Sequence, residues 1–232
     1  EAGAMMYKST GIAMESVFGD GSQKNRGFMG ALAGAGKRLL TGESLFMTAF
    51  THQGQGKAHA AFAAPFPGTI IAVHLPDVDG ELICQKDSFL VAAKGVSIGI
   101  ALQKKIMTGL FGGEGFIMQR LEGDGWCFIH AGGTLVQREL AAGEEIHVDT
   151  GCVVAYTKTV EFEIERAGNV KSMIFGGEGV FFAKLKGPGK VWMQSMPFSR
   201  LAGRIMANLP VTGSGQGEGS VLGPLGSIIR GS

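Results

Sequence analysis

The sequence predicts an all-β fold made of three tandem β-sandwich units, repeated with pseudo-threefold symmetry in one chain. Short segments with alternating apolar and polar residues indicate strands, glycine-rich turns separate them, and a Gly-Glu signature recurs three times. The chain has 232 residues, enough for one large all-β domain or for two to three small ones. Its 39 glycines exceed the usual share of about 7% and follow no collagen-like period. Their excess is explained if most of them mark equivalent turns.

The recurring signature is the main reason for predicting repetition. At Gly113 and again at Gly177 the chain reads Gly-Glu-Gly, followed by an apolar run and further glycines, and these two copies align without a gap. A related copy at 42–50 precedes the middle one at a slightly longer spacing. The signature residues that are candidates for a shared role are Glu43, Gly113, Glu114, Gly115, Gly177, Glu178 and Gly179.

The repeat divides the chain into four segments. The first unit is expected over residues 1–66 and contains a polar, glycine-rich insertion at 19–36. The second unit is expected over 67–130 and the third over 131–209, with strands that can be shared between units. The Gly/Ser-rich composition of 210–232 predicts a flexible tail.

Single strands are predicted from alternation with a period of two. In the first unit a strand follows the signature and reaches Phe50, and in the second unit residues 96–100 alternate. In the third unit residues 146–149 alternate, and residues 160–165 give the clearest case because three apolar residues alternate with three glutamates. Helix is nearly absent from the pattern, and residues 201–209 are the best candidate for a short terminal helix or strand.

A Gly-x-Gly turn follows each signature strand, at residues 54–56, 123–125 and 187–189. Glycine adopts a positive φ at little steric cost, which tight turns between strands require. These segments are therefore predicted to be hairpin turns.

Charge and hydropathy exclude several classes of protein. The chain has 21 basic and 20 acidic residues, so it has no strong net field for nucleic acid or an anionic membrane. No stretch approaches the roughly 20 apolar residues of a membrane span, and the first residues lack the features of a secretory leader. The cysteines, Cys84, Cys127 and Cys152, are odd in number, lie in apolar segments and have no C-x-x-C spacing. They are predicted to be buried free thiols, as in a reducing cytoplasm.

The sequence offers no catalytic, metal or cofactor site. There is no H-x-H pair with a following carboxylate, no nucleophile elbow, and no phosphate-binding loop that leads into a helix. His52 and His59 are seven residues apart across a predicted hairpin turn, a spacing that allows them to face each other. They are interpreted as surface histidines, with a metal pair as the alternative. The signature glutamates are interpreted as acceptors for backbone N–H groups, with a ring of acidic groups as the alternative.

A cluster of lysines bears on RNA binding. Lys184, Lys186 and Lys190 flank the third Gly-x-Gly turn, and binding of single-stranded RNA would combine such cations with exposed aromatic platforms. Only two tryptophans and two tyrosines are available, so nucleic acid is not expected as a partner. The glutamates at 161, 163 and 165 are interpreted as a solvated strand face.

Several motifs in order resemble the altered-inheritance-of-mitochondria type family. They are the Phe-Gly-Gly-Glu-Gly copies at 111–115 and 175–179, the turn and strand at 143–149, and residues 187–195, within a likeness that covers roughly residues 2–200. The resemblance implies a fold similar to the tryptophan RNA-binding attenuation protein, with three units per chain that form a homotrimer and a pseudo-ninefold ring. Fungal mitochondrial relatives are linked to inner-membrane organisation and respiratory-chain biogenesis. The family supplies no catalytic residues.

The sequence therefore favours a non-enzymatic, cytoplasmic structural or scaffold protein. A unit of about 65 residues buries only part of its surface alone, so assembly into a homo-oligomer, a trimer by resemblance, is expected on physical grounds as well. An unidentified protein is the expected partner. The alternative is a binding module for a small ligand or single-stranded RNA, and an enzyme ranks third.

Overall fold

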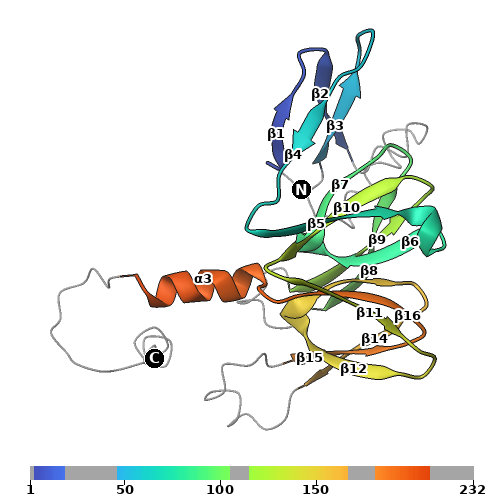
Figure 1. Cartoon of the computed structure of the whole chain (residues 1–232), viewed down its shortest axis with the longest axis vertical. Helices are drawn as coiled ribbons and strands as arrows, with labels where there is room; N and C mark the ends of the chain where they lie inside the picture. The colour runs from blue at the N-terminus through green and yellow to red at the C-terminus, as the bar shows by residue number, and fades with distance from the viewer. Residues whose placement is uncertain (1–2, 19–45, 105–114, 167–180, 210–232) are drawn as a thin grey trace, which may run out of the picture.

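The computed structural model of the chain describes residues 3–18, 46–104, 115–166 and 181–209. The described residues are mostly β-strand, arranged in several sheets, and contain one α-helix (Figure 1). The all-β prediction is confirmed at this level. The predicted insertion at 19–36 and the predicted tail at 210–232 lie outside the described residues.

The elements are named in chain order, with η for short 3-10 helices. They are β1 (Met5–Lys8), β2 (Ile12–Phe18), β3 (Phe46–His52), β4 (Ala60–Phe62), β5 (Gly68–His74), η1 (Leu75–Val78), β6 (Glu81–Gln85), η2 (Lys86–Ser88), β7 (Phe89–Ala92), β8 (Ser97–Lys104), β9 (Phe116–Glu122), β10 (Trp126–Gly132), β11 (Leu135–Leu140), β12 (Glu145–Asp149), η3 (Thr150–Cys152), β13 (Val153–Thr157), β14 (Glu161–Arg166), β15 (Phe181–Lys186), β16 (Gly189–Gln194) and α3 (Phe198–Ala207).

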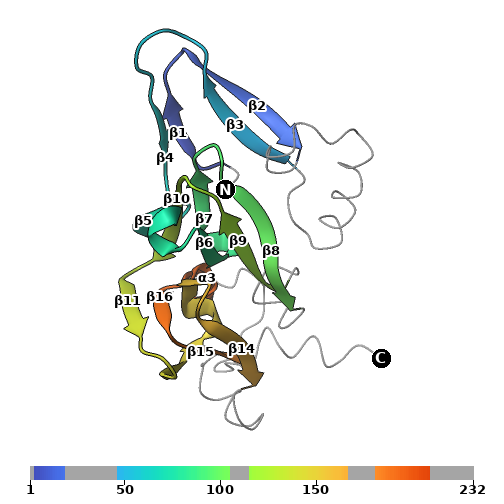
Figure 2. The same ribbon diagram turned by 90° about the vertical axis from the view of Figure 1, so that its right-hand side faces the viewer.

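The same strand pairing recurs along the chain. Strands β5–β10–β7 form one sheet and β6–β9–β8 pair in that order; further along the chain, β11–β16–β13 and β12–β15–β14 pair in the same way. At the start of the chain β1 pairs with β4 and β2 with β3, as β7 pairs with β10 and β8 with β9. These groups of strands follow one another along the long axis of the molecule (Figures 1 and 2). All of these pairs are antiparallel.

One strand pair joins two of these groups into a continuous sheet. Strand β13 pairs with β6, which creates a six-stranded sheet in the order β11–β16–β13–β6–β9–β8. Each residue of β13 is buried, as are the last four residues of β6. This contact between β6 and β13 is called the junction below.

Two apolar cores lie on either side of the junction. The first combines residues of β5, β7 and β10 with residues of β6 and β9, including Leu82, Leu121 and Ile129. The second combines β13 and β16 with β9 and β15, including Phe116 and Leu185. Apolar side chains that alternate along a strand thus enter different cores, which is why strands of this sheet are buried on both faces.

Gln194 connects the two halves by hydrogen bonds. The side chain is buried, its oxygen accepts the Gly132 N–H at 2.7 Å, and its amide nitrogen donates to the Gly151 carbonyl at 2.8 Å. Satisfying both ends of a buried amide avoids the desolvation cost of an unpaired polar group.

The prediction that the Gly-x-Gly segments are hairpin turns is wrong. The segment at 123–125 leaves β9, which pairs with β6 and β8, and enters β10, which pairs with β5 and β7. The segments at 54–56 and 187–189 likewise connect strands of different sheets. Their glycines allow the chain to cross from one sheet to the other. The hairpins are β2–β3, β8–β9 and β14–β15 instead.

Glycine is required in these crossovers because of close backbone contacts. Gly123 has a φ of +149°, and an added Cβ there would overlap the carbonyl oxygen of Gly95. Gly187, at the equivalent position in the next group of strands, approaches the carbonyl oxygen of Ala141 in the same manner. A side chain at either position would overlap the backbone of a neighbouring connection.

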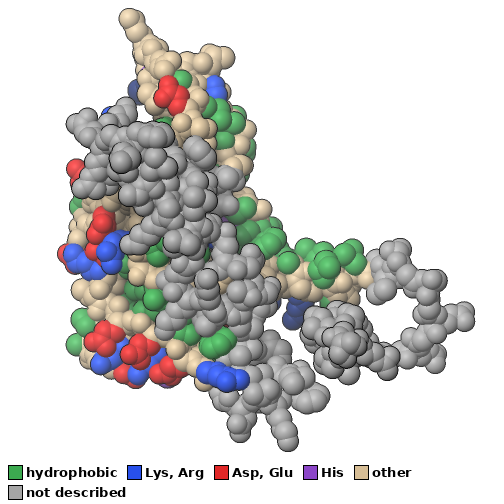
Figure 3. All heavy atoms as spheres, turned by 180° about the vertical axis from the view of Figure 1, so that it is seen from behind, with side chains coloured by type: hydrophobic (Ala, Val, Ile, Leu, Met, Phe, Trp, Pro, Cys, Tyr) green, Lys and Arg blue, Asp and Glu red, His purple; other side chains and the backbone are tan. Residues whose placement is uncertain are grey.

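The predicted terminal element is a helix, α3, which begins at Phe198 rather than Leu201. The helix projects from the body of the molecule (Figure 1), and none of its residues is buried. Its large apolar side chains Phe198, Ile205 and Met206 are exposed, and its charged residues are Arg200 and Arg204. Figure 3 shows the apolar side chains of this helix uncovered.

The crossover geometry predicts that Gly123→Ala lowers the free energy of unfolding by at least about 2 kcal/mol, because it adds backbone strain to a steric overlap. Chemical denaturation monitored by circular dichroism measures the change. Gly99→Ala is the matched control, since nothing lies within 4 Å of a Cβ added there. Equal stabilities of the two variants would contradict the requirement for glycine.

Candidate interaction surface

The signature residues fall in the three equivalent hairpin connections. Gly115 is described, has a φ of +82° and precedes the fully buried Phe116. The other six, Glu43, Gly113, Glu114, Gly177, Glu178 and Gly179, lie outside the described residues. The connections join β2 to β3, β8 to β9 and β14 to β15. The role of the glutamates as backbone acceptors stays a prediction.

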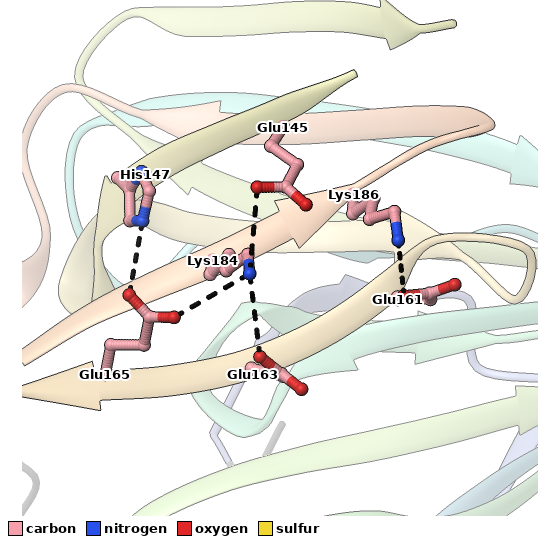
Figure 4. A network of polar contacts seen from close by, with 7 residues as sticks. All are labelled: Glu145, His147, Glu161, Glu163, Glu165, Lys184 and Lys186. Carbon is pink, nitrogen blue, oxygen red and sulfur yellow. Dashed lines mark hydrogen bonds and ion pairs between the residues drawn. The ribbon is translucent and has the colours of Figure 1, made fainter. Parts of the chain in front are cut away.

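A network of charged side chains covers the outer face of β12, β15 and β14 (Figure 4). Lys184, on the central strand, lies 3.6 Å from Glu145, 3.9 Å from Glu163 and 3.8 Å from Glu165. These four side chains come from three strands, since Glu145 is on β12 and the other two glutamates are on β14. Strand register therefore places one ammonium group among three carboxylates.

Two further pairs extend the network. Lys186 lies 3.4 Å from Glu161, and the His147 ring lies 3.3 Å from Glu165. Figure 3 shows acidic and basic side chains intermixed at this end of the molecule. The glutamates on β14 point outward while Phe162 and Ile164 contact the second core, as the alternation predicted.

The network bears on the lysine cluster that the sequence singled out. Lys184 and Lys186 are each paired with carboxylates, so neither presents a free positive charge for a phosphate. Four glutamates against two lysines leave this face with an excess of negative charge, which repels a polyanion. Lys190 lies on β16, outside this face.

The preceding strands β6–β9–β8 contact β14, because Phe116 on β9 stacks with Phe162 on β14. Arg120, at the position equivalent to Lys184, pairs with Glu81 at 3.1 Å. A hollow of about 280 Å³ beside this pair is lined by Ile83, Leu102, Tyr156 and Phe162, among others. Burial raises the pKa of the Tyr156 hydroxyl, which therefore stays protonated near neutral pH.

Strands β12 and β1 are among the strands with an edge beside which no described strand lies. Strand β12 pairs only with β15, and β1 pairs only with β4, within the part of the chain that the structure describes. Met6 and Tyr7 on β1 are 64% and 55% exposed. Sequence reasoning missed these residues. They could have been found by aligning Ile12 with Val96 and Val160, because this alignment shows that β1 is equivalent to β7 and β13.

The histidines were considered as metal ligands. No group of three or more potential ligands exists among the described residues. The ring nitrogens of His52 lie 3.2 and 3.1 Å from the carbonyl oxygens of Gly11 and Gly56, and the backbone N–H of His59 donates to Ser9. His52 thus stabilises the connection between β3 and β4. The hairpin predicted between His52 and His59 is wrong, because β3 and β4 belong to different sheets.

The cysteines are free thiols, as predicted. Cys84 and Cys127 are fully buried, whereas Cys152 is half-buried. Burial raises the pKa of the Cys127 thiol to about 11 and also raises that of Cys84. A thiol in this state is a poor nucleophile, because the thiolate is the reactive form.

His130 is a buried histidine on β10 that the sequence did not single out. It is 1% exposed, its ring packs edge-on against Phe66 with 4.5 Å between centroids, and neither ring nitrogen has a hydrogen-bond partner among the described residues. Burial lowers the pKa of His130, which the nearby Phe66 backbone opposes only in part. The folded protein therefore holds this ring neutral.

The buried ring predicts that stability falls on acidification. The unfolded chain takes up a proton at His130 near pH 6.5, while the folded chain does so only at lower pH. The free energy of unfolding should therefore fall below pH 6.5, with a limiting slope of about 1.4 kcal/mol per pH unit from this group. His130→Leu should flatten this slope in denaturation curves recorded from pH 7 to pH 5. An unaltered slope in His130→Leu would contradict the assignment.

The paired sheets and the two apolar cores place the chain in the class of all-β proteins built from several sheets. The chain belongs to the family described as mitochondrial biogenesis AIM24, which matches residues 1–196. The resemblance drawn from the motifs is confirmed. Helix α3 lies beyond the matched residues.

Two proteins similar to this chain come from Streptococcus pyogenes. An uncharacterized protein of the serotype M6 strain is 29% identical over 216 residues, covering 91% of this chain and 82% of that protein. A crystal structure of a protein from the same species matches with a TM-score of 0.67 and 22% identity, covering 89% of this chain and 87% of that chain. The similarity to this crystal structure supports the all-β fold. No helix among the described residues has the length and apolar character needed to cross a bilayer.

Proposed function

We propose that the protein is a non-enzymatic scaffold of the cytoplasm, which assembles with further copies of itself into a β ring and presents that ring to a protein partner. The observation that carries the proposal is the junction. One chain contains a complete junction between β6 and β13, and it also contains β12, which is equivalent to β6 and has an open edge among the described strands.

The recurring strand pairing supports three related units in the chain. Strands β5–β10 and β11–β16 repeat one pairing scheme, and β1–β4 repeat its last four strands. Successive units joined by the same sheet contact would form a curved array, as in other repeat proteins. We propose a trimer of chains for this array, with an arrangement like that of the tryptophan RNA-binding attenuation protein.

Open sheet edges also support assembly on energetic grounds. The unpaired N–H and C=O groups of an edge strand are a template for another strand, and proteins usually cover or block such edges. Among the described residues, β12 has neither proline nor a covering helix along its open edge. A second copy supplies the missing strand without exposing a new apolar surface.

The proposed role of the ring is structural. The charged groups of the network pair with one another on an open face rather than converging in a closed pocket, which fits a surface better than a catalytic centre. Family membership links this role to mitochondrial biogenesis in relatives, and for this chain we propose a related contribution to membrane or respiratory-complex assembly.

Size-exclusion chromatography with light scattering tests the assembly. The expected mass is three times the 24.2 kDa of one chain. A mass of one chain at micromolar concentration would contradict the scaffold. Because the open edges are paired through backbone groups, the mass should change little between low and high salt.

The hollow at the junction favours a second candidate, the binding of a small ligand. Its lining combines the Arg120–Glu81 pair with apolar side chains, the mixture typical of ligand sites. A thermal-shift screen with amino acids and nucleotides tests this function, and Arg120→Ala should abolish any shift. Salt-sensitive retention of single-stranded RNA on a filter would favour the RNA alternative over both.

A further inference from the structure

Strand β1 is equivalent to β7 and β13. Ile12, Val96 and Val160 are all buried, and each of their N–H groups donates to the carbonyl of the residue three positions earlier, at 3.1, 3.3 and 3.0 Å. Each lies in the turn after β1, β7 or β13, or at the start of the strand that follows it. This alignment places Met6 and Tyr7 of β1 at the positions of Val154 and Ala155 in β13.

The equivalent residues differ sharply in burial. Met6 and Tyr7 are more than half exposed, whereas Val154 and Ala155 are fully buried. Strand β13 lies between β16 and β6, whereas β1 has a described neighbour, β4, on one edge only. Met14 on β2 is also exposed, while Phe162 at the equivalent position on β14 stacks against Tyr156 and Phe116. Strand β1 therefore has the side chains of a junction strand without its neighbour.

Strand β12 is the matching half. It occupies the place of β6 in the next group of strands, and the residues at the ends of both strands cap the next turn in the same way, since Gln85 accepts the Asp87 N–H and Asp149 accepts the Gly151 N–H. Strand β6 is buried in its last four residues, but β12 is exposed or half-buried throughout. It has the position of a junction strand whose partner is missing.

We propose that β1 of one copy adds to β12 of a second copy as an antiparallel strand. The register follows from the junction, in which Ala155, Tyr156 and Thr157 pair with Cys84, Ile83 and Leu82. In the contact between copies the corresponding pairs are Tyr7 with Val148, Lys8 with His147, and Ser9 with Ile146. This assignment rests on the proposed self-assembly and names the strands that perform it.

Charge complementarity supports β1 as the strand that pairs with β12 of a second copy. The face beside β12 has four glutamates for two lysines, and β1 brings Lys8 with no acidic residue. In the register above, Lys8 lies next to His147, whose ring contacts Glu165. The lysine of one copy thus offsets part of the negative excess of the next, and Met6 and Tyr7 lose their contact with water.

A cross-link between copies tests the register. Opposed residues of antiparallel strands have Cα atoms about 4.5–5.5 Å apart, within the roughly 4.4–6.8 Å span of a disulfide. On mild oxidation, the variant Lys8→Cys/His147→Cys should form disulfide-linked dimers and trimers, and no larger species once the ring of three chains is closed. Each single-cysteine variant should form none of these disulfide-linked species. Lys8→Cys combined with Glu165→Cys, on the far strand of the same sheet, is the control for random contact.

A second variant needs no disulfide. Tyr7→Asp places a charge on a residue that is exposed in the single chain, so the chain still folds, and its mass should fall to that of one chain. Met206→Asp, at a still more exposed apolar residue on α3, should leave the mass unchanged. An oligomer that survives Tyr7→Asp and gives no cross-link above the single variants overturns this interface but leaves the scaffold standing. A wild-type chain of single mass overturns both.

Discussion

The pairing of β6 with β13 is the contact on which the rest of the described structure depends. It turns two three-stranded sheets into one six-stranded sheet, and both apolar cores use side chains from that sheet. Because strand side chains alternate between faces, a central sheet can serve two cores at once. Residues at the junction, such as Ile83 and Ala155, are consequently buried although they belong to different groups of strands. Gln194 strengthens the same connection with hydrogen bonds at the sheet ends.

Much of the fold could be predicted from the sequence because its cause is local. The alternation at residues 160–165 identified an outward face of glutamates, and the spacing between the two Gly-Glu-Gly signatures also separates Arg120 from Lys184 and Gln85 from Asp149. The crossover turns were misjudged for a physical reason. A Gly-x-Gly segment has the same local conformational needs in a hairpin as in a step between sheets, and only the choice of pairing partners, which is nonlocal, distinguishes the two.

The surface features also divide into local ones, which could be predicted, and ones that depend on nonlocal strand pairing, which could not. From the sequence, the lysines near residue 184 and the glutamates near residue 163 were separate features, one considered for RNA and the other for solvent. The register of β15 against β12 and β14 brings them together, and their pairing removes the free positive charge. The open edges of β1 and β12 could not be recognised from composition, since nonlocal contacts decide which strands pair. Burial differences between equivalent residues, such as Tyr7 and Ala155, reveal them.

The junction also has a consequence for the geometry of higher assemblies. Strands β6 and β13 are different surfaces, so a contact of this kind is heterologous and runs head to tail. Repeating such a contact generates either a closed ring or an open helical filament, and the rotation between neighbouring units decides which of the two forms. That rotation is already fixed inside a single chain, by the twist of the six-stranded sheet and the two cores beneath it. If copies of the chain join through the same contact, core packing within one chain therefore controls whether the array closes.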